Sequence, residues 1–216
     1  MTWDAAAARA EMVERQLRRR GITDERVLDA MGRVPREVFI PASLADHAYD
    51  DSALPIGQDQ TISQPFVVAT ICALLALRET DRVLDVGTGS GYQAAVLAEL
   101  VAEVVTIERI PELAAEASAK LSEAGYTNVE VRVGDGSLGV PERAPFDAIA
   151  VAAAAPRVPP ELYRQLAQSG RLVLPRGSRW GQELVLVERT REGAAERRSI
   201  PCRFVPLVGD EGFGHD

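Results

Sequence analysis

The stretch VLDVGTGSGY at residues 83–92 constrains the fold more than any other part of this chain. It is a short apolar run that leads into three alternate glycines and then into a helical pattern. In α/β proteins such a turn follows a strand of a parallel sheet, and ligands bind at the carboxyl ends of these strands. The stretch therefore predicts a parallel sheet with a ligand site at one edge.

Apolar runs and helical patterns alternate from Asp81 onward. Runs with the length and composition of strands lie at residues 82–86, 104–108, 129–133, 147–152 and 171–174. Helical patterns lie between them at residues 93–100, 111–124 and 160–168. This alternation predicts an α/β fold with a mostly parallel, Rossmann-like sheet and helices on both of its faces.

The chain before this core has a different pattern. Residues 2–20 predict a helix that Thr2 or Asp4 caps and Gly21 ends, and a second, short helix follows it. Residues 34–64 read mostly as loop, and so long an irregular segment is usually functional. These residues predict an N-terminal helical extension joined to the core by a loop.

The chain after the core predicts an antiparallel hairpin, formed by residues 183–189 and 197–205. The length suits one large domain. We therefore expect a single domain over residues 1–216, made of N-terminal helices and a loop (1–64), an α/β core (65–175) and C-terminal strands with a tail (176–216).

Charge and cysteine usage exclude several classes of protein. The chain carries 24 basic and 32 acidic residues, a net charge of -8 that repels a phosphate backbone, so we expect no nucleic-acid partner. Cys72 and Cys202 have no further Cys or His at metal-ligand spacing, so we expect free thiols and no metal. The sequence shows neither a signal-peptide pattern nor a membrane-length apolar run, which favours a cytoplasmic protein without a membrane partner.

Three strand ends supply candidates for a cofactor site. The first is the glycine loop, with Asp85, Gly87, Thr88, Gly89, Ser90 and Gly91. Glu108 ends the next strand, where a carboxylate can accept both hydrogen bonds from a ribose diol. After the third strand, Asp135 stands beside Gly136 and can hydrogen-bond the exocyclic amine of a base.

The glycine spacing separates two classes of adenosine-containing cofactor. A dinucleotide pyrophosphate favours G-x-G-x-x-G, whereas this chain has G-x-G-x-G close after an acidic residue. The pattern suits S-adenosylmethionine, which has an ammonium group and no phosphate. A nicotinamide cofactor, or a glycine turn without any ligand, stays open as an alternative.

The chain is poor in candidate bases. Histidine occurs only at His47 and His215, which argues against a His-centred triad, and we interpret His47 as a surface or packing residue. Methylation of a carboxylate needs no base, because a carboxyl group with a pKa of about 4 is already ionised at pH 7. Such a reaction depends on alignment and on the exclusion of water.

The loop LPIGQDQTISQP at residues 54–65 carries the best candidates for that alignment. Thr61, Ser63 and Gln64 have small or amide side chains that can orient a carboxylate. An alternative role for Ser63 or Gln64 is to cap a helix that begins at Pro65.

Four segments resemble the protein-L-isoaspartate O-methyltransferase family, in a likeness that spans nearly the whole chain: LPIGQDQTISQP (54–65), VLDVGTGSGYQAAVLA (83–98), GYTNVEVRVGDG (125–136) and RFVPLVG (203–209). The resemblance implies an S-adenosylmethionine-dependent methyltransferase fold. It implies methylation of the free α-carboxyl of L-isoaspartyl residues in damaged proteins and peptides. The ester then cyclises to a succinimide, whose hydrolysis returns some normal aspartate, so the implied role is protein repair.

The resemblance also implies roles for particular residues. Ser63 matches the active-site serine of the family, and Gly87, Gly89, Glu108 and Asp135 match its cofactor contacts. The implied substrate-binding residues are Thr61, Ile62, Gln64, Val205, Pro206 and Leu207, the last three of which help close the site.

The chain departs from the family pattern at two positions. Asp59 stands where relatives often have glycine, and Val140 replaces a common tryptophan. An inward-pointing carboxylate at Asp59 would weaken the binding of a carboxylate substrate.

Other functions stay open at this point. They are a methyltransferase acting on RNA or a small molecule, a methyltransferase-like binding protein without activity, and a nicotinamide oxidoreductase. The acidic charge disfavours RNA, and the intact TISQP and glycine motifs disfavour an inactive protein. We expect isoaspartyl-containing proteins as partners and a monomeric chain.

Overall fold

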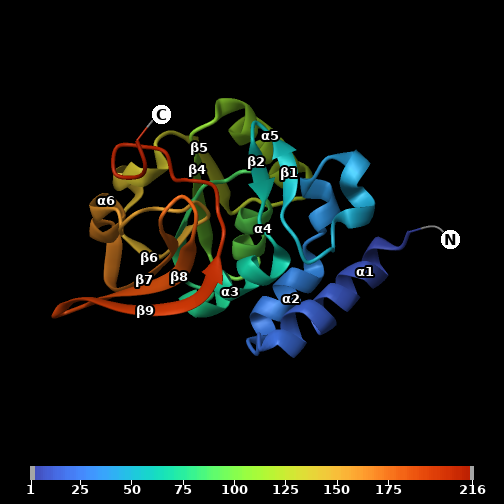
Figure 1. Cartoon of the computed structure of the whole chain (residues 1–216), viewed down its shortest axis with the longest axis horizontal. Helices are drawn as coiled ribbons and strands as arrows, with labels where there is room; N and C mark the ends of the chain where they lie inside the picture. Colours follow the sequence, from blue (N-terminus) through green and yellow to red (C-terminus); the bar gives the residue numbers. More distant parts are fainter. Residues whose placement is uncertain (1–2, 215–216) are drawn as a thin grey trace.

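A seven-stranded sheet forms the centre of the computed structural model, which describes residues 3–214 (Figure 1). The strand order is β5-β4-β3-β6-β7-β8-β9, in which β5 to β7 pair in parallel and β8 and β9 pair antiparallel. The strands are β3 (Arg82–Val86), β4 (Glu103–Glu108), β5 (Val129–Val133), β6 (Phe146–Val151), β7 (Leu166–Gly177), β8 (Gln182–Thr190) and β9 (Gly193–Cys202). The predicted α/β class, with a mostly parallel sheet and a C-terminal antiparallel hairpin, is confirmed.

Helices cover both faces of the sheet, as predicted (Figure 1). They are α3 (Pro65–Leu75), α4 (Tyr92–Ala98), α5 (Pro111–Glu123) and α6 (Pro160–Arg164). One core cluster contains Val68 of α3, Leu97 of α4 and Leu121 of α5. The second contains Leu162 of α6 with Ile149 of β6, so α6 packs on the opposite face.

Two predicted boundaries near the C-terminus are wrong. The helix expected over residues 160–168 ends at Arg164, because Leu166 pairs with Phe146 of β6 and becomes the first residue of β7. The last strand begins at Gly193 and ends at Cys202, four residues earlier than expected at its start. Gly193 has a φ of +125°, which allows a tight turn there, and residues 203–205 leave the sheet.

The N-terminal extension is helical but not a single α-helix. It begins as α1 (Ala5–Glu11), continues as one π-helical stretch (Met12–Leu17) and ends in a 3-10 turn (Arg18–Arg20) before Gly21, whose φ is +96°. The carboxylate of Asp4 caps α1 by accepting from the amides of Ala6 and Ala7, whereas Thr2 lies outside the described residues. The predicted cap at Asp4 and the stop at Gly21 are confirmed.

The helix α2 (Glu25–Arg33) ties this extension to the core. The guanidinium of Arg26 donates hydrogen bonds of 2.6 Å to the carbonyls of Leu77 and Leu100, just beyond the ends of α3 and α4. Cationic donors are favourable at helix C-termini because the last carbonyls have no helical partner. Among residues 3–214, no helix has the length and apolar character needed to span a membrane.

Residues 34–64 are more ordered than the predicted loop. They contain 3-10 helices at Arg36–Phe39 and Ala42–His47 and a two-stranded hairpin of β1 (Leu54–Gly57) and β2 (Gln60–Ile62). The turn residues Gln58 and Asp59 have φ values of +52° and +56°. Two successive left-handed residues are typical of a tight hairpin turn, in which Asp is well tolerated. The hairpin ends directly before α3.

Candidate active site

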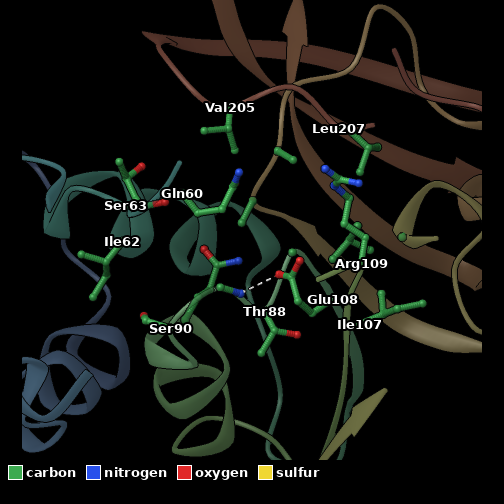
Figure 2. Close-up of a pocket in the computed structure, with 18 of the residues that line it drawn as sticks. Gln60, Ile62, Ser63, Thr88, Ser90, Ile107, Glu108, Arg109, Val205 and Leu207 are labelled. Carbon is green, nitrogen blue, oxygen red and sulfur yellow. Dashed lines mark hydrogen bonds between the residues drawn. The ribbon is translucent and has the colours of Figure 1, made fainter. Parts of the chain in front are cut away.

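A cavity of about 320 Å³ lies at the carboxyl ends of β3, β4 and β6 (Figure 2). Four segments line it. They are the hairpin (Asp59, Gln60, Thr61, Ile62, Ser63), the glycine loop and start of α4 (Val86, Gly87, Thr88, Gly89, Ser90, Tyr92, Gln93), the end of β4 (Ile107, Glu108, Arg109) and a C-terminal segment (Val205, Pro206, Leu207, Val208), together with Val68, Gly136, Ala152 and Ala153. The structure thus brings most of the predicted cofactor and substrate residues to one cavity.

The glycine loop forms one wall. Gly87, Gly89 and Gly91 have φ values of +93°, +51° and +90°, which only glycine adopts readily. Gly91 is not among the lining residues, and a Cβ there would lie 3.3 Å from Ala117 of α5. The absence of a side chain at Gly91 therefore allows α4 to pack closely against α5.

Glu108 connects the glycine loop to the end of β4. Its Oε2 accepts a hydrogen bond of 2.9 Å from the amide of Gly89, and its Oε1 accepts one of 3.0 Å from the amide of Ile110. The side chain is 6% exposed. A carboxylate has about four acceptor positions, so each oxygen keeps one for a ligand hydroxyl.

Asp85 lies behind the cavity wall and is fully buried. It accepts hydrogen bonds of 2.8 Å from Nε2 of Gln93 and from Oγ1 of Thr106. Burial raises the pKa of Asp85 to about 6, although the two hydrogen bonds act to lower it. The predicted cofactor contact at Asp85 is therefore indirect in this geometry.

Asp135 lies beside the cavity but binds the C-terminal segment. Its Oδ1 accepts from the amide and hydroxyl of Ser137, at 2.8 and 2.7 Å, and its Oδ2 accepts from the amide of Asp210 at 2.8 Å. The neighbouring Gly136 lines the cavity, and a Cβ there would lie 2.7 Å from Cγ1 of Val86. One acceptor position on Oδ2 stays available, so the predicted contact between Asp135 and a base stays a prediction.

The hairpin places Thr61 at the cavity, together with Ile62 and Ser63 (Figure 2). Ser63 is half-buried, and its hydroxyl makes no hydrogen bond within the described residues. Gln64, not Ser63, is the capping residue of α3, and it makes no side-chain capping bond. Its amide donates instead to the carbonyl of Asp51, so Gln64 points away from the lining set.

The C-terminal segment closes the cavity from another side (Figure 2). The amide of Ala154 donates to the carbonyl of Val205 at 2.8 Å, and the amide of Leu207 donates to the carbonyl of Ala154 at 2.7 Å. These two hydrogen bonds pair the C-terminal segment with the residues that follow β6. They hold Val205, Pro206 and Leu207 over the cavity, where the family resemblance places them.

Sequence reasoning missed several lining residues. Ala152, Ala153 and Arg109 follow the ends of β6 and β4, so the rule that ligands bind at carboxyl strand ends could have found them. Gln93 stands two residues after the glycine run. Tyr92 directly follows Gly91 and carries the same signal, whereas Val68 of α3 has no sequence signal because tertiary packing alone brings it there.

Among the described residues, the cavity has no metal-binding cluster and no histidine in its lining that could act as a base. Residues 3–214 contain no group of three or more His, Cys, Asp or Glu side chains placed to hold a metal. The exposed His47 has Nδ1 at 2.9 Å from Oδ2 of Asp50 and does not line the cavity, and His215 lies outside the described residues. Asp59 lines the cavity at its exposed edge.

The cavity fits a nucleoside cofactor. Glycine backbone without side chains forms one wall, and Glu108 offers free acceptor positions beside it. A sheet with this site at its carboxyl edge defines a Rossmann-like protein of the S-adenosylmethionine-dependent methyltransferase class.

Comparisons with known proteins narrow the class. Residues 7–212 match the model of the protein-L-isoaspartate(D-aspartate) O-methyltransferase family, so the chain belongs to that family. It is 54% identical to protein-L-isoaspartate O-methyltransferase 2 of Marinobacter nauticus, over 97% of each chain. It is 56% identical to protein-L-isoaspartate O-methyltransferase of Roseiflexus castenholzii, over 90% of this chain and 89% of that one.

Solved structures agree with this assignment. A protein-L-isoaspartate O-methyltransferase superposes with a TM-score of 0.84 at 28% identity, covering 94% of this chain and 67% of the other. A Plasmodium falciparum beta-aspartate methyltransferase in complex with S-adenosyl-L-homocysteine superposes with a TM-score of 0.80 at 26% identity, covering 93% and 98% of the two chains. The predicted family and methyltransferase fold are confirmed.

Proposed function

We propose that this chain transfers a methyl group from S-adenosylmethionine to the free α-carboxyl of L-isoaspartyl residues in damaged proteins and peptides. The observation that carries the proposal is the meeting of Ser63 and Glu108 at one cavity, in a chain of this family. The ester cyclises to a succinimide, whose hydrolysis returns some normal aspartate. The enzyme thereby begins the repair of the damaged residue.

The proposed reaction needs little acid-base catalysis by the protein. When bound, S-adenosylmethionine supplies a methyl group activated by a sulfonium. The acceptor carboxyl group, with an ordinary pKa of about 4, is ionised at neutral pH and needs no base. The chain therefore contributes by aligning the acceptor oxygen and keeping water out, and the apolar side chains of Ile62, Val205 and Leu207 serve the second task.

Residues from different segments around the cavity have different roles in the proposed reaction. Ser63 is the catalytic residue and orients the acceptor carboxylate through its hydroxyl. The proposed cofactor residues are Asp85, Gly87, Thr88, Gly89, Ser90, Gly91, Glu108, Asp135 and Gly136, of which Glu108 accepts from the ribose hydroxyls. The proposed substrate-binding residues are Thr61, Ile62, Gln64, Val205, Pro206 and Leu207.

The remaining expectations concern the chain as a whole. We propose that residues 1–216 act as one methyltransferase domain with the three regions 1–64, 65–175 and 176–216. We also propose that it is a cytoplasmic monomer without nucleic-acid partners, and its net charge of -8 supports the last point. Light scattering and a titration with labelled RNA test the monomer and the absence of nucleic-acid binding.

The decisive experiment compares two peptides that differ only in linkage. Labelled methyl transfer from S-adenosylmethionine is measured on an isoaspartyl peptide and on its aspartyl counterpart. We expect labelling of the isoaspartyl peptide alone, because the extra backbone methylene moves the carboxylate by about an ångström, which is enough to lose the reactive alignment. Equal labelling of both peptides would overturn the proposed function.

A further inference from the structure

Gln93 holds an unused hydrogen-bond acceptor at the cavity. The residue belongs to the first turn of α4, lines the cavity and is 6% exposed. Its Nε2 donates to Oδ1 of Asp85 at 2.8 Å. Its Oε1 is buried and has no hydrogen-bond partner in the part of the chain that the structure describes. A buried acceptor without a donor destabilises a fold, which points to a ligand that supplies the donor.

The neighbours of Asp85 fix the orientation of this amide. Oδ2 of Asp85 accepts from the hydroxyl of Thr106, whose oxygen lies 2.6 Å from that of Thr88. An ionised carboxylate accepts hydrogen bonds and donates none, so the amide nitrogen of Gln93 faces Asp85 and its carbonyl oxygen faces away. Since Asp85 lies behind the wall and Gln93 lies in it, the carbonyl oxygen is the atom of this amide that is left for a ligand in the cavity.

The negative charge of Asp85, which lies behind Gln93, favours a positively charged hydrogen-bond donor. Asp85 is fully buried, and its partners among residues 3–214 are the uncharged side chains of Gln93 and Thr106 rather than a cation. A buried carboxylate without a counter-cation favours a positively charged ligand nearby, because the low-dielectric interior strengthens the attraction. The amide of Gln93 stands between that carboxylate and the cavity.

The proposed cofactor has three kinds of donor, and two of them have other partners. In the proposed function Glu108 accepts from the ribose hydroxyls, and Asp135 is the predicted partner of the adenine amine. Building on the proposed function, we infer that Oε1 of Gln93 accepts a hydrogen bond from the α-ammonium of the methionyl part of the cofactor. Asp85 is then a positioning residue, which holds the amide and places its charge behind it.

The inference is tested by calorimetry with two ligands. S-adenosylhomocysteine carries the α-ammonium, whereas 5′-methylthioadenosine keeps the adenosine and thioether but lacks the amino acid. Gln93→Leu removes the amide at similar volume. The matched control is Gln165→Leu, at a buried glutamine whose Oε1 accepts from the amide of Val140 and whose Nε2 donates to the carbonyl of Leu138.

We expect Gln93→Leu to weaken S-adenosylhomocysteine binding about ten- to a hundred-fold and to change 5′-methylthioadenosine binding by less than about threefold. The control should leave the ratio of the two affinities unchanged. If Gln93→Leu does not fold, the longer and more flexible Gln93→Met replaces it. Equal losses for both ligands, or no loss for either, would overturn the inference. Failure of the unaltered chain to bind either ligand would overturn the proposed function, and this inference with it.

Discussion

The amide of Gly89 donates a hydrogen bond of 2.9 Å to Oε2 of Glu108 (Figure 2). This bond joins the glycine loop after β3 to the last residue of β4, and the second carboxylate oxygen holds the amide of Ile110 in the same way. The carboxylate is therefore fixed in place before any ligand arrives. A fixed acceptor loses little conformational entropy on binding, which favours tight binding of a ribose diol.

The first prediction concerns the cofactor affinity of Glu108→Ala. Loss of a charge-assisted pair of hydrogen bonds costs about 1.5 to 3 kcal/mol, or about ten- to a hundred-fold in the dissociation constant of S-adenosylhomocysteine. Calorimetry measures this constant. Glu112→Ala, at an exposed residue in the first turn of α5, is the control and should bind normally. An unchanged affinity in a folded Glu108→Ala variant would place the ribose elsewhere.

The second prediction separates a catalytic role of Ser63 from a capping role. Because its hydroxyl makes no hydrogen bond in the described structure and Gln64 is the capping residue, Ser63→Ala should leave the melting temperature nearly unchanged. Turnover should fall about 10- to 1000-fold if the hydroxyl contact strengthens in the transition state. Ser122→Ala, on the exposed side of α5, serves as the control. A lower melting temperature with normal kcat would show that Ser63 only supports the helix.

The third prediction concerns the acidic residue at the hairpin turn. Asp59 lines the cavity that receives an anionic acceptor, so Asp59→Asn should lower the KM for an isoaspartyl peptide about two- to fivefold at low salt. Asparagine tolerates the φ of +56° found at this position, so the turn itself is preserved. The effect should shrink in high salt because ions screen exposed charges. Glu192→Gln is the control, because it removes an equal charge in the turn between β8 and β9, which is distant from Asp59 in the sequence. An equal effect of Glu192→Gln on the KM would contradict a local role for Asp59.

The fourth prediction concerns the pH dependence of stability. Burial raises the pKa of Asp85 from 3.8 to about 6 in the folded chain, so the folded state binds this proton more tightly than the unfolded state does. Asp85 therefore contributes stability that is fully present below about pH 3.8 and is lost as the pH rises through about 6. The rise in the pKa of Asp85 corresponds to about 3 kcal/mol of stability.

Asp85→Asn removes this titration. Its unfolding free energy, measured by urea at several pH values without ligand, should rise relative to that of the parent between about pH 4 and pH 7 and then level off. Around Asp85, Gln93 and Thr106 donate to it, Glu108 raises its pKa through like charge, and Cys72 stays a neutral thiol because burial raises its own pKa. A difference between variant and parent that is constant across this range would contradict the prediction.

The fifth prediction concerns the C-terminal segment. A Cβ on Gly209 would lie 2.0 Å from Oδ1 of Asp135, so Gly209→Ala must displace that carboxylate, the segment that carries Val205 and Leu207, or both. We expect the KM for an isoaspartyl peptide to rise about tenfold, a change of about 1.4 kcal/mol. The dissociation constant of S-adenosylhomocysteine should change much less. Gly181→Ala, where a Cβ meets nothing within 4 Å, is the control.

Kinetics of the Gly209→Ala variant discriminate between two roles of the segment. An unchanged KM would show that the segment does not contact the peptide. A large loss of S-adenosylhomocysteine affinity would show that the link between Asp135 and Asp210 supports the cofactor site instead.

Sequence patterns predicted the parallel strands well because these strands are short runs of β-branched and other apolar residues between helical patterns. The strands at residues 82–86 and 129–133 have the predicted bounds, and Glu108 stands at a strand end as expected. The β1–β2 hairpin was missed because its turn uses Gln58 and Asp59 rather than the Asn-Gly or Asp-Gly pairs typical of such turns. Local sequence thus located the sheet but not the hairpin that carries the substrate loop.

The candidate site was predictable only where it follows strand ends. The rule for parallel sheets places the glycine loop, Glu108 and Gly136 together, and the structure brings all three to the cavity. The hydrogen bond between Asp135 and Asp210 could not be predicted, because the two residues are distant in sequence and meet only in the folded chain. The unpartnered oxygen of Gln93 likewise depends on the exact placement of Asp85.

The hairpin and the C-terminal segment bound the cavity on two sides, and this has a consequence for the proteins under repair. In the proposed function, the isoaspartyl carboxylate reaches Ser63 on a piece of backbone that lies between these two segments, so a damaged residue inside a rigid helix or sheet is first released by local unfolding. That release adds to the free energy of binding, and each 1.4 kcal/mol of local stability raises the apparent KM about tenfold. The rate of methylation would then rank damaged sites by how loosely their surroundings hold them, with frayed ends and mobile loops repaired first.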